Sequence, residues 1–157
     1  MRRKDRELSS SEEIFSVIDQ CKVVRVAFPQ EDVPYLVPLN FGYLREGEKL
    51  ILYFHGAFEG RKMELLRNRP RVSFEMDCGH ELTGKDTACS HGFLFQSVIG
   101  WGTAEIVEEE AEKILGLERL MLHQTGREFS ITPKEAASVA VFRIQVESLT
   151  GKARRSF

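Results

Sequence analysis

The chain has 157 residues, of which 42% are hydrophobic and 29% charged, so we expect a single domain, residues 1–157, with its own core. A net charge of −2 gives no basic field for nucleic acid, and no stretch approaches the roughly 20 apolar residues that span a membrane, so neither is expected as a partner. Because residues 1–7 are charged without a following apolar run and only three cysteines are present, we expect a cytoplasmic protein without a secretory signal.

Hydrophobic periodicity predicts three helices and six strands. In chain order these are a helix over 11–20, strands over 22–28, 36–43 and 49–55, a helix over 61–69, strands over 71–77 and 93–107, a helix over 108–123 and a strand over 138–146. Either Ser9 with Glu12 or Ser10 with Glu13 forms a capping box at the first helix. Residues 78–91 are predicted as a polar loop and 150–157 as a basic solvated tail. Short connections favour a mainly β protein of the α+β type, a small closed or split antiparallel barrel with helices at its rim.

The strand over 36–43 is interrupted by proline. Pro34 and Pro38 each remove a ladder donor, which predicts an edge strand or a bulge. Such a strand leaves backbone groups free to bind a flat ligand, and Pro38 with Asn40 would present carbonyls and an amide to it. The prolines also protect an edge from aggregation, and the two interpretations are compatible.

The helix over 61–69 begins with two cations after a glycine. Free backbone N–H groups and the helix dipole favour an anion at such a start, and Gly60 lets the backbone come close. Arg61 and Lys62 therefore either bind an anionic group or form a solvated surface pair.

His55 ends the strand over 49–55 beside Gly56. Its imidazole either faces a ligand or substrate, where it could serve catalysis, or bonds a neighbouring backbone group.

Two cysteines and two histidines lie in the predicted loop over 78–91. Cys78 and His80, like Cys89 and His91, are separated by one residue, which is not the usual spacing of zinc ligands. We therefore predict no metal site there.

Several motifs occur in order along nearly the whole chain: M-R-R-K-D-R-E at the start, V-P-L-N-F-G-Y, Y-F-H-G-A-F-E-G-R-K, Q-S-V-I-G-W-G-T-A-E and L-T-G-K. Together they resemble the flavin-binding split barrels related to pyridoxamine 5′-phosphate oxidase, and are most similar to the 5-nitroimidazole-resistance branch. The resemblance implies a six-stranded antiparallel split barrel, a homodimer, and FMN or FAD in two equivalent clefts between subunits.

The resemblance also implies a set of cofactor-binding residues. They are Val37, Pro38, Leu39 and Asn40 at the isoalloxazine edge, Phe54 and His55 at a flavin-contacting strand end, Gly60, Arg61 and Lys62 at the phosphate, and Gln96 and Ser97 reaching flavin from the opposite subunit. The chain lacks the C-terminal Trp and Arg of true pyridoxamine phosphate oxidases, which argues against that substrate.

The function that the resemblance implies is an FMN-binding oxidoreductase that reduces a small molecule such as a nitroaromatic ring. Because no G-x-G-x-x-G motif is present, NADH or NADPH would dock transiently as the donor. Two alternatives stay open, namely a flavin-storing or flavin-sensing protein without turnover, and a haem-binding relative of the same fold.

Overall fold

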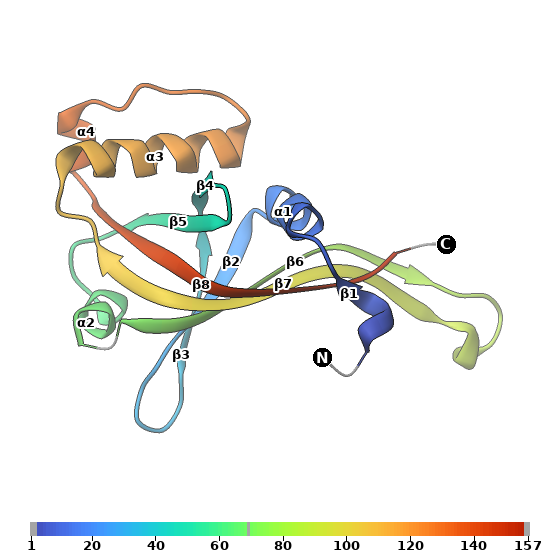
Figure 1. Cartoon of the computed structure of the whole chain (residues 1–157). Coiled ribbons are helices and arrows are strands. Elements are labelled where there is room, and N and C mark those ends of the chain that lie inside the picture. The colour runs from blue at the N-terminus through green and yellow to red at the C-terminus, as the bar shows by residue number, and fades with distance from the viewer. Residues whose placement is uncertain (1–2, 69, 156–157) are drawn as a thin grey trace.

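The computed structural model of the chain describes residues 3–68 and 70–155 (Figure 1). Its elements are η1 (Lys4–Arg6), β1 (Glu7–Leu8), α1 (Ser11–Gln20), β2 (Val23–Phe28), β3 (Tyr35–Asn40), β4 (Gly42–Glu46), β5 (Lys49–Gly56), α2 (Arg61–Asn68), β6 (Arg71–Thr83), η2 (Ala88–Ser90), β7 (Gly92–Ile106), α3 (Glu110–Thr125), α4 (Pro133–Ala137) and β8 (Ala140–Arg154). The prediction of a mainly β protein with helices is confirmed. Within the two described ranges, no helix is both long and apolar enough to cross a membrane.

The strands form one antiparallel sheet of eight strands, so the prediction of six is wrong. The hydrogen-bonded path runs β3-β2-β6-β7-β8-β5-β4, with β1 beside β8. The path is not closed, because β3 and β4 stand at its two ends. These two strands follow each other in the chain with only Phe41 between them.

The single strand predicted over 36–43 is therefore two strands. The chain leaves β2 at Asn40 and joins β5 from Gly42 onwards. A Cβ on Gly42 would lie 2.2 Å from the backbone nitrogen of Leu120, so β4 presses directly against α3. β3 pairs only with β2, which confirms that the prolines mark an edge strand.

Two segments predicted to be irregular are strands. β6 runs on to Thr83 and β7 begins at Gly92, so residues 78–83 of the predicted loop over 78–91 belong to a strand. The prediction of a solvated tail over 150–157 is also wrong as far as Arg154, because β8 continues there and pairs with β7 and β1. Ser156 and Phe157 lie outside the described residues. Hydrophobic periodicity did not predict this part of the strand, because Gly151 packs inward without an apolar side chain. A Cβ on Gly151 would meet the Leu8 side chain at 2.8 Å.

The helices follow their capping signals. Ser10 and Glu13 form the capping box of α1, the second of the two alternatives. α2 ends at Asn68, and the predicted last residue Arg69 lies outside the described residues. α4 was not predicted, although Thr132 supplies it with a capping box. α3 lies over β4 and β5, whereas α2 packs beside β2 and β7 (Figure 1).

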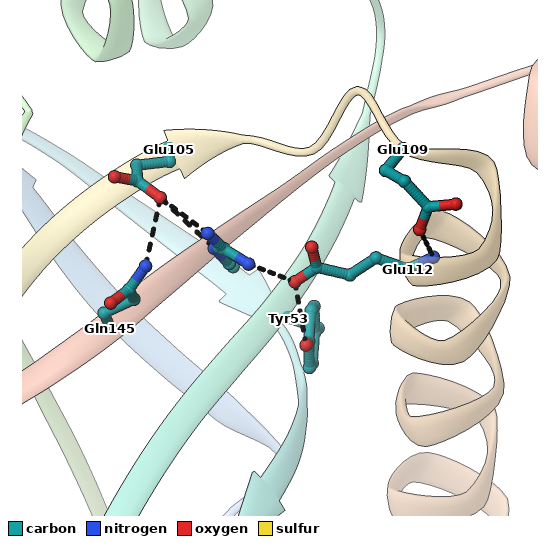
Figure 2. A network of polar contacts seen from close by, with 6 residues as sticks. Tyr53, Glu105, Glu109, Glu112 and Gln145 are labelled. Carbon is teal, nitrogen blue, oxygen red and sulfur yellow. Dashed lines mark hydrogen bonds and ion pairs between the residues drawn. The ribbon is translucent and has the colours of Figure 1, made fainter.

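A polar network holds α3 to the sheet, and we call it the α3 clamp: Tyr53, Glu105, Glu112 and Arg143 (Figure 2). The Tyr53 hydroxyl donates to Glu112 at 3.1 Å, and Arg143 donates both to Glu112 and, at 2.9 Å, to Glu105. Burial, followed by the nearby Glu112 charge, raises the pKa of Tyr53 to about 12. The clamp connects β5, β7 and β8 to the first turn of α3.

The core fills the interior of the sheet with aromatic rings. Phe28, Phe54, Phe74 and Phe142 are almost fully buried, and Phe54 stacks on Phe142 with centroids 4.7 Å apart. Each such burial stabilises the fold by about 1.5–3 kcal/mol. This aromatic layer lies directly beneath the start of α2, where Lys62 meets the Phe142 ring.

Candidate functional site

The edge strand β3 offers an unpaired backbone. Val37 and Leu39 are half-buried against the core, whereas Pro38 and Asn40 are exposed on the other face. The Asn40 amide donates to the Lys22 carbonyl at 3.1 Å, which ties the end of β3 to the start of β2. Because β3 pairs on one side only, its other edge is free to bind a flat ligand through main-chain groups.

The first turn of α2 has free hydrogen-bond donors. The backbone nitrogens of Met63 and Glu64 both donate to the Gly60 carbonyl, at 2.9 and 3.2 Å. Within the part of the chain that the structure describes, the backbone N–H groups of Arg61 and Lys62 have no acceptor. Gly60 has a φ of 121°, which favours glycine and leads the chain into this turn.

Lys62 is a partly buried cation beside an aromatic ring. Its ammonium lies 5.1 Å from the centroid of the Phe142 ring, and a Cβ on Gly56 would be only 2.8 Å from it. No carboxylate among residues 3–68 and 70–155 pairs with it, and burial lowers the pKa of its ammonium. An ammonium in this position is stabilised by any anion that reaches it.

Arg61 stands at the rim of a groove. Its Nη2 donates to Gln30 Oε1 at 2.6 Å, and its Nη1 lies 3.5 Å from Glu64 Oε2. The groove, about 810 Å³ in volume, runs between the β2–β3 loop and α2. Because Gln30 is neutral and Arg61 is half-exposed, the guanidinium can turn towards an anion at little cost.

The end of β5 places two predicted residues on opposite faces. Phe54 is only 1% exposed in the core, so it can reach a ligand only through its backbone. His55 is exposed and pairs with Val141 along the strand. Among the described residues its imidazole has no hydrogen-bond partner, which leaves it available to a ligand.

Gln96 and Ser97 lie away from the start of α2. They belong to β7, three strands from β3 in the sheet. The Gln96 amide donates to Gln20 Oε1 at 3.4 Å and accepts from Arg155 Nε at 3.2 Å, whereas Ser97 is in register with Asp77 on β6. The start of α2 lies beside the end of β5, where a Cβ on Gly56 would be 2.8 Å from Lys62 Nζ, and Arg61 lines one groove with the β2–β3 loop, whereas Gln96 contacts Gln20 and Arg155 instead.

The cysteines and histidines predicted in one loop have different neighbours. His80 pairs with Asp77 at 2.8 Å, His91 Nδ1 lies 3.0 Å from the Thr87 carbonyl, and Cys89 is exposed. No cluster of three or more His, Cys, Asp or Glu suited to a metal occurs in the described ranges.

Sequence reasoning missed the partners of the two cations. Phe142 was predicted only as part of the strand over 138–146, and Gln30 was not singled out. Neither residue carries a local signal, because each becomes a neighbour of α2 only in the folded chain.

Comparison with known proteins places this arrangement in a family. The family model described as pyridoxamine 5′-phosphate oxidase matches residues 10–153. A candidate 5-nitroimidazole antibiotic resistance protein from Bacteroides thetaiotaomicron is 31% identical, with 94% of this chain and 86% of that chain covered and a TM-score of 0.80.

Two further structures share the fold at lower identity. The flavocytochrome Anf3 from Azotobacter vinelandii is 22% identical, with 99% and 72% of the two chains covered and a TM-score of 0.78. An FAD and heme binding protein from Mycobacterium smegmatis is 18% identical, with 97% and 75% covered and a TM-score of 0.76. No curated protein matches the sequence. The family match over residues 10–153 and the 31% identity over most of the chain show that this chain belongs to the pyridoxamine 5′-phosphate oxidase family.

Proposed function

We propose that the protein binds FMN and uses it to reduce a small molecule. The observation that carries this proposal is the start of α2, where the Lys62 ammonium lies next to Arg61 and two backbone N–H groups, and where the described residues supply neither a counter-ion for Lys62 nor acceptors for these N–H groups. A flavin phosphate would supply the missing anion through charge-assisted hydrogen bonds. Membership in the pyridoxamine 5′-phosphate oxidase family supports the same cofactor.

The neighbouring elements suit the rest of the cofactor. The isoalloxazine would lie along the free edge of β3, contacting the backbone of Val37, Pro38, Leu39 and Asn40. Phe54 would contribute its main chain at the end of β5, where His55 is exposed. FAD would use the same rim, with its additional phosphate and adenosine extending into the groove beside Arg61.

A second copy of the chain would complete the cleft. Gln96 and Ser97 lie on β7, which is not next to β3 in the sheet, and we propose that they reach this flavin from a partner subunit. Apolar side chains are exposed on β3 and β7 themselves, with Leu36 59%, Ile99 56% and Trp101 41% exposed. A homodimer would cover these side chains and bring Gln96 to the flavin.

The chemistry would be electron transfer through the bound flavin, which supplies the hydride or electron step. His55, whose imidazole has no hydrogen-bond partner among the described residues, would hold or deliver a proton at the substrate. The similarity to a candidate 5-nitroimidazole resistance protein supports a nitroaromatic substrate, and NADH or NADPH would dock transiently as the donor. All three cysteines are free, which supports the reducing cytoplasm as its location.

An absorption spectrum of the purified protein tests the cofactor. Bands near those of oxidised flavin are expected, whereas a dominant Soret band would favour haem, which is named with FAD in the similar protein from Mycobacterium smegmatis. Oxidation of NADH or NADPH with a nitroimidazole acceptor then tests turnover. Flavin binding without any turnover would contradict the enzyme and leave a flavin-binding protein.

A further inference from the structure

The two ends of the described chain meet on one side of the sheet. β1 pairs with β8, with Glu7 opposite Lys152 and Leu8 opposite Gly151, and η1 packs against the same strand (Figure 1). The segments that meet, residues 3–8 and 151–155, contain most of the M-R-R-K-D-R-E motif and the end of the L-T-G-K motif. The proposed flavin site uses neither motif.

This junction is basic, although the net charge of the whole chain is −2. Residues 3–8 and 151–155 carry the cations Arg3, Lys4, Arg6, Lys152, Arg154 and Arg155 and the carboxylates Asp5 and Glu7. Gathering like charges costs free energy through self-repulsion, and an anion bound between them offsets that cost. The pairing of β1 with β8 therefore creates a local positive field that the overall composition does not reveal.

A groove of about 480 Å³ runs through the junction, and we call it the terminal groove. Four arginines line it, namely Arg3, Arg6, Arg154 and Arg155. Three carboxylates also line it, namely Asp5, Glu7 and Glu13. Its volume lies within the range of sites that hold small ligands, about 300–1,000 Å³.

Two of the four arginines are already paired with carboxylates. Arg3 donates two hydrogen bonds to Asp5, at 2.8 and 2.6 Å. Arg155 Nη1 lies 3.4 Å from Glu13 Oε1. These two pairs neutralise two of the three carboxylates in the terminal groove, so they do not compete with an anion for the other two arginines.

Arg6 and Arg154 have free hydrogen-bond donors. Arg6 Nε lies 3.9 Å from Asp5 Oδ2, which is beyond hydrogen-bond distance. The Arg154 guanidinium makes no hydrogen bond or ion pair with any described residue. A Cβ on Gly92 would lie 2.5 Å from Arg154 Nη2, so the guanidinium packs directly on the Gly92 backbone. A guanidinium held in this way presents a planar fork that matches two oxygens of a phosphate.

We propose that the terminal groove binds the 2′-phosphate of NADPH and makes the protein select NADPH over NADH as its donor. This inference rests on the proposed function, in which a nicotinamide dinucleotide docks transiently at the flavin. Arg155 connects the groove to that site, because its Nε donates to Gln96 Oε1 at 3.2 Å and Gln96 is proposed to reach the flavin of the partner subunit.

The roles of the arginines follow from their contacts. Arg6 and Arg154 hold the 2′-phosphate, which as a phosphate monoester carries close to two negative charges at neutral pH. The adenosine end of the donor lies in the terminal groove, and the nicotinamide end extends past Gln96 to the flavin. NADH has a hydroxyl in place of this phosphate, so it leaves both guanidinium groups without an anion.

The test is a calorimetric titration of the purified protein with NADP⁺ and with NAD⁺, which differ only in the 2′-phosphate and do not reduce the flavin. Each arginine should contribute roughly tenfold, the lower end for a charge-assisted hydrogen bond, because the groove is open to water. The wild type should therefore bind NADP⁺ at least roughly 10-fold more tightly than NAD⁺.

Three variants locate the effect. Arg6→Ala and Arg154→Ala should each weaken NADP⁺ binding and leave NAD⁺ binding unchanged. Neither change should unfold the protein, because neither guanidinium makes a hydrogen bond within the described chain. Arg127→Ala removes the same charge from the loop after α3, which does not line the groove, and should change the binding of neither ligand.

Four results would overturn the proposal. The first two are equal affinity of the wild type for NADP⁺ and NAD⁺, and no binding of NADP⁺ at all. The third is a preference for NADP⁺ that survives in both Arg6→Ala and Arg154→Ala. The fourth is an equal loss of both ligands in these variants, which would mean that the two arginines act through the structure.

The titration reports binding without turnover, so it separates this inference from the proposed function. If NADP⁺ is preferred through Arg6 and Arg154 but the protein binds no flavin, the terminal groove stands and the proposed oxidoreductase fails. If the protein binds FMN and reduces a nitroimidazole equally well with NADH and NADPH, the proposed function stands and the terminal groove fails.

Discussion

Gly116 provides a sharp test of how α3 packs on the sheet. It lies in the middle of α3, where glycine ordinarily costs about 1 kcal/mol relative to alanine, so Gly116→Ala would stabilise an isolated helix. In the folded chain, however, its Cβ would lie 2.7 Å from Cδ1 and 3.1 Å from Cγ of the Tyr53 ring. That ring is 1% exposed, and its hydroxyl is held by Glu112, so it has little room to move away.

The packing cost should exceed the helix gain. Overpacking a core typically costs about 1–3 kcal/mol, which leaves a net destabilisation of about 1 kcal/mol. Thermal unfolding at fixed protein and flavin concentration should show Tm falling by about 2–4 °C. In a Tyr53→Leu background, which removes the ring, the same Gly116→Ala change should raise Tm instead. A rise of equal size in both backgrounds would refute the close contact.

Three further predictions concern ionisable groups that are buried or half-buried. Burial lowers the pKa of the His123 imidazole, so the unfolded state takes up the proton first and the free energy of unfolding should drop as the pH falls from about 6.5. His123→Gln should flatten this pH dependence of the free energy of unfolding, measured with urea. The raised pKa of Tyr53, about 12 against about 10 unfolded, means stability is lost between those values as pH rises, and Tyr53→Phe should remove one late step from the absorbance titration at about 295 nm. Arg143→Met leaves Glu105 and Glu112 without their shared cation and should cost about 1.5–3 kcal/mol in urea unfolding, whereas a loss below about 0.5 kcal/mol would contradict the clamp.

Local signals in the sequence predicted much of the fold. The capping box of Ser10 and Glu13 located α1, and Pro38 identified the edge strand, because each effect acts within a few residues. The break at Phe41 could not be predicted in this way, since it depends on α3 pressing against Gly42 from 78 residues further along the chain. The C-terminal half of β8 was missed because Gly151 packs inward without an apolar side chain of its own.

The residues of the candidate site could likewise be predicted only where the signal is local in the sequence. Arg61 and Lys62 could be predicted as a pair because Gly60 and the helix start are adjacent in sequence. The aromatic ring under Lys62 belongs to Phe142, and Gln30 holds Arg61 from the β2–β3 loop. These contacts arise from tertiary packing, for which a single sequence carries no spacing signal.

The central claim is that Arg61 and Lys62 bind the flavin phosphate. Replacing either by alanine removes charge-assisted hydrogen bonds worth about 1.5–3 kcal/mol, so FMN binding should weaken roughly 10- to 150-fold. The Lys62 variant should fall at the upper end, because its ammonium is more shielded from water than the half-exposed Arg61 guanidinium. Arg67→Ala removes the same charge from the other end of α2 and serves as the matched control.

The most direct measurement is a parallel titration of the wild type and these three variants with FMN and with riboflavin, which lacks the phosphate. We expect Arg61→Ala and Lys62→Ala to weaken FMN binding strongly and to change riboflavin binding little. Arg67→Ala should change the binding of neither ligand. Equal weakening of both ligands would mean that the two cations act through the structure, and no weakening of either would mean that the start of α2 is not the phosphate site.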